Sequence, residues 1–178
     1  MISLSHQLIR GGLVALACLS GAASAGLLVE PEPDWAEAEH VLPPAPAEAS
    51  LRSFFVSSAS PNRFFVDEAS VDVGADGVVR YVLVVRTPGG TENVTFEGLR
   101  CATGERRIYA SGRQDGSWVA MKNSAWAPIS NNAYNRPRAA LAWDILCDGP
   151  AAPRDRSEAL RRLRGGADYT DPSKGVRP

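Results

Sequence analysis

The run from Val78 to Arg86 constrains the fold of this chain more than any other stretch. It reads Val-Val-Arg-Tyr-Val-Leu-Val-Val-Arg, and its β-branched and aromatic residues favour a strand. Because apolar residues point to both faces of that strand, both faces must be covered. The sequence therefore predicts a sheet in which this strand is central.

The residues that follow predict a hairpin. The turn is Thr87-Pro88-Gly89-Gly90-Thr91, because proline presets a turn and blocks continuation of the strand. Residues 92–101 return as the second strand. Symmetric closure predicts three cross-strand pairs, Arg86 with Glu92, Val84 with Val94, and Val82 with Phe96. This register places an ion pair at the end of the hairpin and an apolar face inside it.

Further strands are predicted at residues 51–56, 64–73, 105–111 and 118–121, mostly separated by short turns. One helix is expected at residues 137–147, with Asn135 as its cap and Pro137 in its first turn. The predicted fold class is α+β. It comprises an antiparallel β-meander of about five to six strands with one packed C-terminal helix and a single disulfide.

The first 25 residues have the pattern of a signal peptide, with a basic start, a short apolar run and the small residues Ala23-Ser24-Ala25. Cleavage would remove Cys18 and leave Cys101 and Cys147, which we expect to form a disulfide in an oxidising compartment. The predicted localisation is the periplasm. The alternative is a lipoprotein, because residues 15–18 loosely match a cleavage box that would make Cys18 a lipidated N-terminus.

Composition divides the chain into four parts. They are a signal peptide at residues 1–25, a Pro/Ala/Glu-rich linker at 26–49, a globular α+β domain at 50–148 and an Arg-rich flexible tail at 149–178. The formal net charge of −1 gives no general attraction to nucleic acid or to anionic membranes. We therefore expect no nucleic acid partner, and membrane association only if Cys18 is lipidated.

The most distinctive motif of the central block is Glu97-Gly98-Leu99-Arg100-Cys101, which follows a valine-rich strand. Together with Phe65-Val66-Asp67 before it and Gly116-Ser117-Trp118 after it, the block resembles the cryptic neisserial protein-like family of exported bacterial proteins. The resemblance covers residues 54–147. No reaction is assigned to that family, so the resemblance implies export and one compact domain, and it supplies no catalytic residue.

The chain contains two histidines, His6 in the predicted signal peptide and His40 in the predicted linker. The globular domain is therefore expected to contain none. This argues against Ser-His-Asp and Cys-His catalysis and against most zinc sites. We expect no metal and no cofactor.

Arginines give the best candidate for a binding surface. The hairpin puts Arg80 and Arg100 on one sheet face, and a two-residue turn at Thr103-Gly104 would place Arg107 opposite Arg100, with Tyr109 nearby. Guanidinium groups so close together repel one another unless anions neutralise them, and arginine binds carboxylate or phosphate bidentately. A bound carboxylate or phosphate is one interpretation of this cluster. The alternatives are exposure to water or internal pairing with Asp67, Glu97, Glu105 or Asp144.

Asp144 lies between two apolar sides of the predicted helix, so its carboxylate should be partly buried and paired with a sheet arginine. A second interpretation is a general acid with a raised pKa. The same four acidic residues are the only candidates for a glycosidase without histidine, and nothing in their spacing singles out a pair. Trp118 and Trp126 are expected to pack in the core or at its rim, the alternative being a sugar- or peptide-binding platform.

The function that these features favour is a non-enzymatic binding or adaptor module of the cell envelope. Its partner would be an unknown envelope protein or a small anionic ligand, bound on the sheet face that carries Arg80 and Arg100. The alternative is a carboxylate-dependent hydrolase that acts on a cell-wall glycan without histidine.

Overall fold

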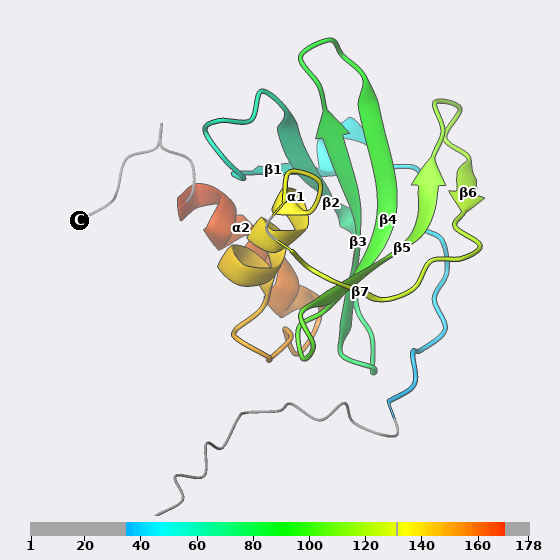
Figure 1. Ribbon diagram of the computed structural model, residues 1–178, viewed down its shortest axis with the longest axis vertical. Helices are drawn as coiled ribbons and strands as arrows, with labels where there is room; N and C mark the ends of the chain where they lie inside the picture. Colours follow the sequence, from blue (N-terminus) through cyan, green and yellow to red (C-terminus); the bar gives the residue numbers. More distant parts are fainter. Residues whose placement is uncertain (1–34, 131, 170–178) are drawn as a thin grey trace, which may run out of the picture.

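The computed structural model describes residues 35–130 and 132–169. The predicted signal peptide, Cys18 and the start of the predicted linker lie outside these residues. Within them, a twisted antiparallel sheet separates two helical segments from an extended N-terminal segment (Figure 1). The α+β prediction is therefore confirmed.

The sheet is a meander in which strands that are consecutive in sequence are neighbours in space. Its strands are β1 (Leu51–Phe54), β2 (Arg63–Val73), β3 (Val78–Arg86), β4 (Glu92–Arg100), β5 (Glu105–Gly112), β6 (Trp118–Ala120) and β7 (Ala127–Pro128). The short β7 pairs with the start of β5. It was not predicted, because two residues that end in proline carry no strand signal.

The β3–β4 hairpin has the predicted register. Arg86 pairs with Glu92, Val84 with Val94 and Val82 with Phe96, and the Arg86 guanidinium forms an ion pair with the Glu92 carboxylate. β3 is central, and residues 78–84 are all buried. The apolar residues on both faces of β3 therefore indicated its position correctly.

The predicted helix is present as α1 (Arg136–Ala139), which continues directly into η2 (Ala140–Leu146). Pro137 lies in the first turn as expected, but the Asn135 side chain does not cap the helix. Its amide nitrogen instead donates to the Ser130 hydroxyl at 3.0 Å. None of the helices within the described residues is long and apolar enough to cross a bilayer.

The winding of η2 corrects the predicted orientation of Asp144. The segment is a π-helix, closed by a bond from the Cys147 N–H to the Ala142 carbonyl. Each residue of a π-helix turns through a smaller angle than in an α-helix, so a pattern drawn for an α-helix loses its phase. Leu141 and Ile145 point inward, whereas Trp143 and Asp144 are exposed. The predicted partial burial of Asp144 was therefore wrong.

A second helix, α2 (Arg156–Tyr169), occupies part of the chain that was predicted to be a flexible tail. Ala159, Leu160 and Leu163 are buried against the same core as η2, so a short apolar stripe anchors the helix. Arg156 adds a bond from its guanidinium to the Val71 carbonyl at 2.8 Å. The many arginines concealed this stripe in the sequence.

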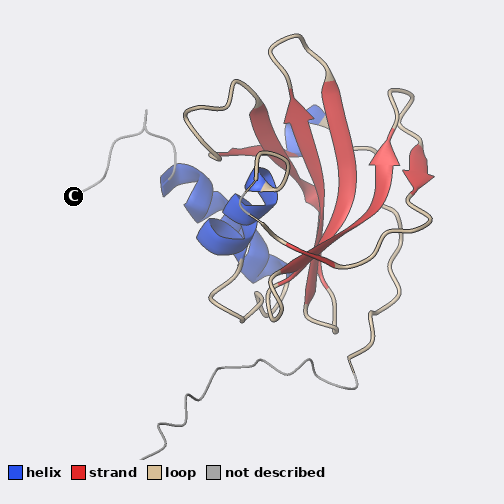
Figure 2. Cartoon of the chain, viewed as in Figure 1, coloured by secondary structure: helices blue, strands red, loops and turns tan. Residues whose placement is uncertain are grey.

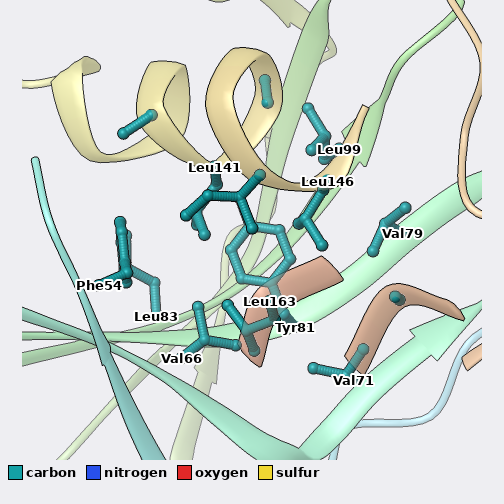
Figure 3. Packing of buried hydrophobic residues seen from close by; sticks show 14 of the residues in the cluster. Phe54, Val66, Val71, Val79, Tyr81, Leu83, Leu99, Leu141, Leu146 and Leu163 are labelled. Atoms are coloured by element: carbon teal, nitrogen blue, oxygen red, sulfur yellow. The ribbon is translucent and has the colours of Figure 1, made fainter. Parts of the chain in front are cut away.

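The larger core lies between the sheet and the helices (Figure 2). The Tyr81 ring lies at its centre and is fully buried (Figure 3). Leu141 and Leu146 of η2, together with Leu163 of α2, surround the ring from the helical side. This packing holds η2 and α2 against β3 of the sheet.

The predicted disulfide between Cys101 and Cys147 is confirmed, with the two Cα atoms 5.6 Å apart. It joins the turn after β4 to the residue that ends η2. The bond therefore connects the sheet layer to the helical layer.

The opposite face of the sheet is covered by residues 35–46, which we call the strap. The strap has no regular secondary structure and leads through the short helix η1 (Glu48–Ser50) into β1. In Figure 1 it is the blue trace on the right of the sheet, and the helices lie on the left. This part of the predicted linker is thus an element of the folded domain.

Candidate functional site

The predicted basic residues do lie on one face of the sheet, the face that the strap covers. Arg80 pairs with Gly98, and Arg100 lies two residues further along β4, so both side chains leave the sheet on the same side. Arg107 is also on this side, but it pairs with Gly98 rather than with Arg100. The turn after β4 spans residues 101–104, so that Glu105 takes the place opposite Arg100.

Tyr109 lies on the strap face because it follows Arg107 by two residues on β5, and alternate residues of a strand share a face. It is also the extra residue of a bulge between the pairs Glu97–Ile108 and Phe96–Ala110. The bulge puts Ala110 on the strap face as well, beside Phe96.

The anion at this site is a carboxylate of the chain itself. Glu37 of the strap accepts hydrogen bonds from the Arg107 guanidinium at 2.5 Å, the Tyr109 hydroxyl at 2.6 Å and the Trp126 indole at 3.1 Å. Arg80 lies 3.7 Å from the same carboxylate. The alternative of internal pairing is therefore the one observed, although the partner is none of the four acidic residues considered.

Gly98 makes room for this arrangement. A Cβ atom at this position would lie 2.3 Å from the Tyr109 hydroxyl oxygen and 3.0 Å from the Trp126 ring. Both side chains cross the sheet directly above the glycine. The glycine of the Glu-Gly-Leu-Arg-Cys motif is thus required for the contacts with Glu37.

Asp76, in the turn between β2 and β3, completes the site. Its carboxylate accepts a 2.6 Å bond from Arg80 and a 2.8 Å bond from the Ala38 N–H. The Arg80 side chain is only 3% exposed. Trp35 donates from its indole to the Asp76 carbonyl at 2.9 Å. Arg80 and Asp76 therefore hold the strap backbone as well as each other.

Aromatic contacts extend the site along the strap. The Arg100 guanidinium lies 3.9 Å from the centre of the Trp35 ring, a cation–π contact. The His40 ring lies 4.0 Å from the Tyr109 ring. His40 is therefore part of the folded domain, and the prediction that the domain contains no histidine was wrong.

The two tryptophans singled out in the sequence also hold the strap. Trp118 donates to the Pro43 carbonyl at 2.7 Å, and Trp126 packs edge-on against Trp35 with ring centres 5.9 Å apart. Their partners lie at least 75 residues away in sequence. No local pattern links residues so far apart, which is why the strap was interpreted as a linker.

The electrostatics of the site favour a charged carboxylate. Burial alone would raise the pKa of Glu37, but bonds from Tyr109 and Trp126 and the charge of Arg107 outweigh burial and lower it. Burial likewise opposes the charge of Arg80, and bonding to Asp76 raises its pKa above the ordinary value. The site thus binds a carboxylate, and Glu37 of the same chain supplies it.

The four candidate acidic residues lie in different environments. Glu97 is buried and bonds Arg138, whose Nε donates at 2.9 Å. Asp67 accepts from the Ala69 N–H, Glu105 accepts from the Thr103 hydroxyl, and Asp144 is exposed. Among residues 35–130 and 132–169, no group of three His, Cys, Asp or Glu side chains is placed to hold a metal ion.

The comparison with known families covers more of the chain than the central motif. The model of the CNP1-like family matches residues 30–164. The chain belongs to the CNP1-like family. The matched region includes the strap and the buried stripe of α2, both of which lie outside the block that carried the resemblance.

One curated relative is the cryptic neisserial protein 1 of Neisseria gonorrhoeae (strain ATCC 700825 / FA 1090). It is 26% identical over 123 residues, which cover 62% of this CNP1-like chain and 60% of the relative. The chain thus spans about 60% of the length of the relative that it matches. No solved structure matches the chain.

The CNP1-like domain also carries an open surface on the helical side of the sheet, which we call the Tyr134 trough. It comprises three adjacent hollows of about 460, 620 and 620 Å³. Val56 and Arg136 line both the first and the second hollow, and Tyr134 lines both the second and the third. The hollows are therefore neighbours on this side of the domain.

Large exposed side chains mark the length of the Tyr134 trough. Trp143, Tyr134 and Met121 are 56%, 59% and 46% exposed, and each lines one or two of the hollows. Tyr134 is held in place because Arg138 donates to its carbonyl at 2.6 Å and lies 4.6 Å from its ring centre. An exposed aromatic ring fixed in this way is typical of a binding surface.

The charges of the trough are mainly basic. Arg106, Lys122, Arg136 and Arg138 line it, and Asp144 is the one acidic residue among the described residues that line it. Arg138 is neutralised by Glu97, whose charge and hydrogen bonds raise the pKa of the arginine against the effect of burial. Arg106, Lys122 and Arg136 form no ion pair with any carboxylate in the described part of the chain.

Proposed function

We propose that this CNP1-like protein is exported to the periplasm and acts as a non-enzymatic binding module of the cell envelope, with the Tyr134 trough as its working surface. One observation carries the proposal: fixed, exposed aromatic and apolar side chains alternate there with basic groups that have no carboxylate partner within the described residues. Exposed apolar surface combined with uncompensated charge is a feature of partner sites.

The contrast between the two sheet faces supports this choice of surface. On the strap side, Arg80 and Arg107 are paired with Asp76 and Glu37. In the trough, Arg106, Lys122 and Arg136 are not paired in this way among the described residues, so they are available to a ligand that carries negative charge. This moves the expected contact surface from the face that carries Arg80 and Arg100 to the other side of the sheet.

The shape and lining of the trough favour an extended protein segment as the ligand. Hollows in series accommodate a chain rather than a compact molecule. Their floors contain aliphatic and aromatic groups such as Val56, Phe64, Val85 and Ile108, which suit apolar side chains. We therefore expect a segment in which apolar and acidic side chains alternate.

Export is supported by two features. The first 25 residues have the signal-peptide pattern, and a structural disulfide such as Cys101–Cys147 is typical of an oxidising compartment. Mass spectrometry of the protein from an envelope fraction tests this point. A chain that begins at Gly26 supports export, whereas a lipid mass on Cys18 contradicts a soluble periplasmic form.

Binding is tested by fluorescence anisotropy with a labelled peptide of alternating glutamate and leucine. The variant Arg106→Gln/Arg136→Gln should weaken binding at least about tenfold, because it removes two charge-assisted contacts. Tyr134→Ala should weaken binding as well. Arg113→Gln is the matched control, since Arg113 is exposed in the β5–β6 turn, outside the trough.

Three results would count against the proposal. The first is that the peptide does not bind, and the second is that the charge variants bind it as well as the control does. The third is that a peptide with glutamine in place of glutamate binds as well as the original peptide. Binding of an acidic polysaccharide in preference to the peptide would contradict the assignment of a protein ligand.

A further inference from the structure

We propose that the strap is exchangeable between molecules, so that the receptor face of one copy binds residues 35–46 of a second copy. This inference concerns the opposite face of the sheet and does not depend on the function proposed for the Tyr134 trough. The receptor face consists of Arg80, Arg107, Tyr109, Trp118 and Trp126, together with Asp76.

The strap is attached by side-chain contacts and not by strand pairing. Its described bonds involve the Glu37 carboxylate, the Trp35 indole, and the backbone of Ala38 and Pro43. None of them is part of the sheet ladder, in which β1 is the edge strand. The strap can therefore leave the sheet without breaking a strand pair.

The receptor face, in contrast, is built from the sheet and remains when the strap leaves. Its groups come from β3, β5, β6 and the segment before β7, and Arg80 and Asp76 stay bonded to each other. In an empty face, water would replace the Glu37 carboxylate as the acceptor for Arg107 and the Tyr109 hydroxyl. The empty receptor therefore offers a second carboxylate the same charge-assisted hydrogen bonds that it gives to Glu37.

The geometry specifies what can bind there. The ligand needs an indole against Arg100, a carboxylate two residues later for Arg107 and Tyr109, and a free backbone N–H next to it for Asp76. The strap of a second copy meets every condition because its sequence is identical. Exchange of an identical element between protomers is a low-cost route to a dimer.

The connection to β1 also suits exchange. Pro43, Pro44 and Pro46 lie at the end of the strap, and proline-rich segments stay extended at about 3.1 Å per residue. Glu48 of η1 forms an ion pair with Arg86 and is exposed, so the hinge is held by a surface contact. Because the strap is covalently linked to its own receptor, the closed monomer should dominate in dilute solution.

Complementary variants of the mature chain test the proposal. Glu37→Gln damages the strap and leaves the receptor intact, whereas Arg107→Gln/Tyr109→Phe damages the receptor and leaves the strap intact. In a mixture, the intact strap of the Arg107→Gln/Tyr109→Phe chain finds an intact receptor only on the Glu37→Gln chain. We expect a heterodimer in sedimentation velocity, with a Kd at least about tenfold below that of either self-association.

Glu39→Gln replaces Glu37→Gln in the control mixture, because Glu39 is an exposed glutamate of the same strap. The proposal fails if the Glu37→Gln mixture forms no more heterodimer than this control at millimolar concentration. Circular dichroism establishes that each variant is folded. A labelled peptide of residues 34–46 gives a second measurement, since it should bind the Glu37→Gln chain and not the Arg107→Gln/Tyr109→Phe chain.

The two proposals are separable by their variants. Arg106→Gln/Arg136→Gln alters only the Tyr134 trough and should leave heterodimer formation unchanged. Loss of the heterodimer in that background would contradict exchange through the receptor face.

Discussion

The side chains of Tyr109 and Trp126 cross the sheet directly above Gly98, where only a residue without a Cβ atom leaves room for them. Gly98 therefore determines whether Glu37 can be bound. A methyl group there would displace Tyr109 or Trp126. The motif around Gly98 was recognisable in the sequence, but the reason for its glycine was not. That reason depends on residues of β5 and of the strap, far away along the chain.

The variant Gly98→Ala should therefore lower the free energy of unfolding by about 1–3 kcal/mol, the usual cost of overpacking. Urea unfolding followed by tryptophan fluorescence measures the change. Gly89→Ala is the control, because a Cβ atom there meets only the Thr87 hydroxyl, at 3.9 Å. Equal midpoints for the two variants would show that the crossing above Gly98 is not tight.

Glu97 and Arg138 form a buried ion pair between β4 and α1, with side chains 0% and 6% exposed. Removal of one partner leaves an uncompensated charge, so Glu97→Gln should cost about 3–5 kcal/mol of stability. The double variant Glu97→Gln/Arg138→Met should recover much of this loss. Chemical denaturation measures both, and a double variant no more stable than the single one would contradict the explanation.

The exposed pair Arg52–Glu68 is the matched comparison at the same scale. Its arginine is 44% exposed, so Arg52→Gln should change stability by less than about 1 kcal/mol. A similar cost for both pairs would mean that burial does not determine their contributions.

At the scale of elements, β1 to β6 could be predicted from the sequence because strands and turns have local signals. α2 could not, since its apolar stripe is short and is surrounded by arginines, and the ion pair that ties Arg164 to Glu68 of β2 has no local signal. The direction of the η2 side chains could not be predicted either, because the sequence does not reveal a change from α- to π-helical winding.

The contact between α2 and β2 makes a prediction about acid. A hydrogen bond from Arg164 and a further bond from Arg52 outweigh burial and lower the pKa of Glu68 to about 2. Because the pKa is lower in the folded chain, the stabilisation is complete above the ordinary value of 4.5 and is lost as the pH falls towards 2.

Thermal unfolding between pH 7 and pH 2 measures this loss. Glu68→Gln should be less stable at pH 7 and should depend less steeply on pH below 4.5. Glu39→Gln, which changes an exposed carboxylate of the strap, should keep the wild-type profile. An unchanged slope in Glu68→Gln would contradict the role assigned to the Arg164 contact.

At the scale of the whole molecule, three layers are stacked in the order helices, sheet and strap. The first two layers followed from the sequence, because a helix must cover a sheet and because two cysteines remained to be paired. The third layer did not, since its proline-rich composition is that of a linker and its contacts all join distant residues.

The disulfide acts at this scale because it limits the unfolded chain as a whole. It closes a loop between residues 46 positions apart, for which chain entropy gives about 4 kcal/mol of stabilisation. The variant Cys101→Ser/Cys147→Ser should lose about this amount in urea unfolding. Wild-type protein in reductant should behave in the same way, and an unchanged midpoint in either case would contradict the prediction.

The placement of Trp126 has a consequence for the order in which the molecule is completed. The strap is made before the sheet, yet one of its contacts is with a residue 89 positions later in the chain. Contacts that span so much of the chain form late in folding. During synthesis, the strap therefore remains exposed until nearly all the strands have been made. In that interval it is accessible to proteases, to chaperones and to the sheets of neighbouring chains whose own straps are not yet bound.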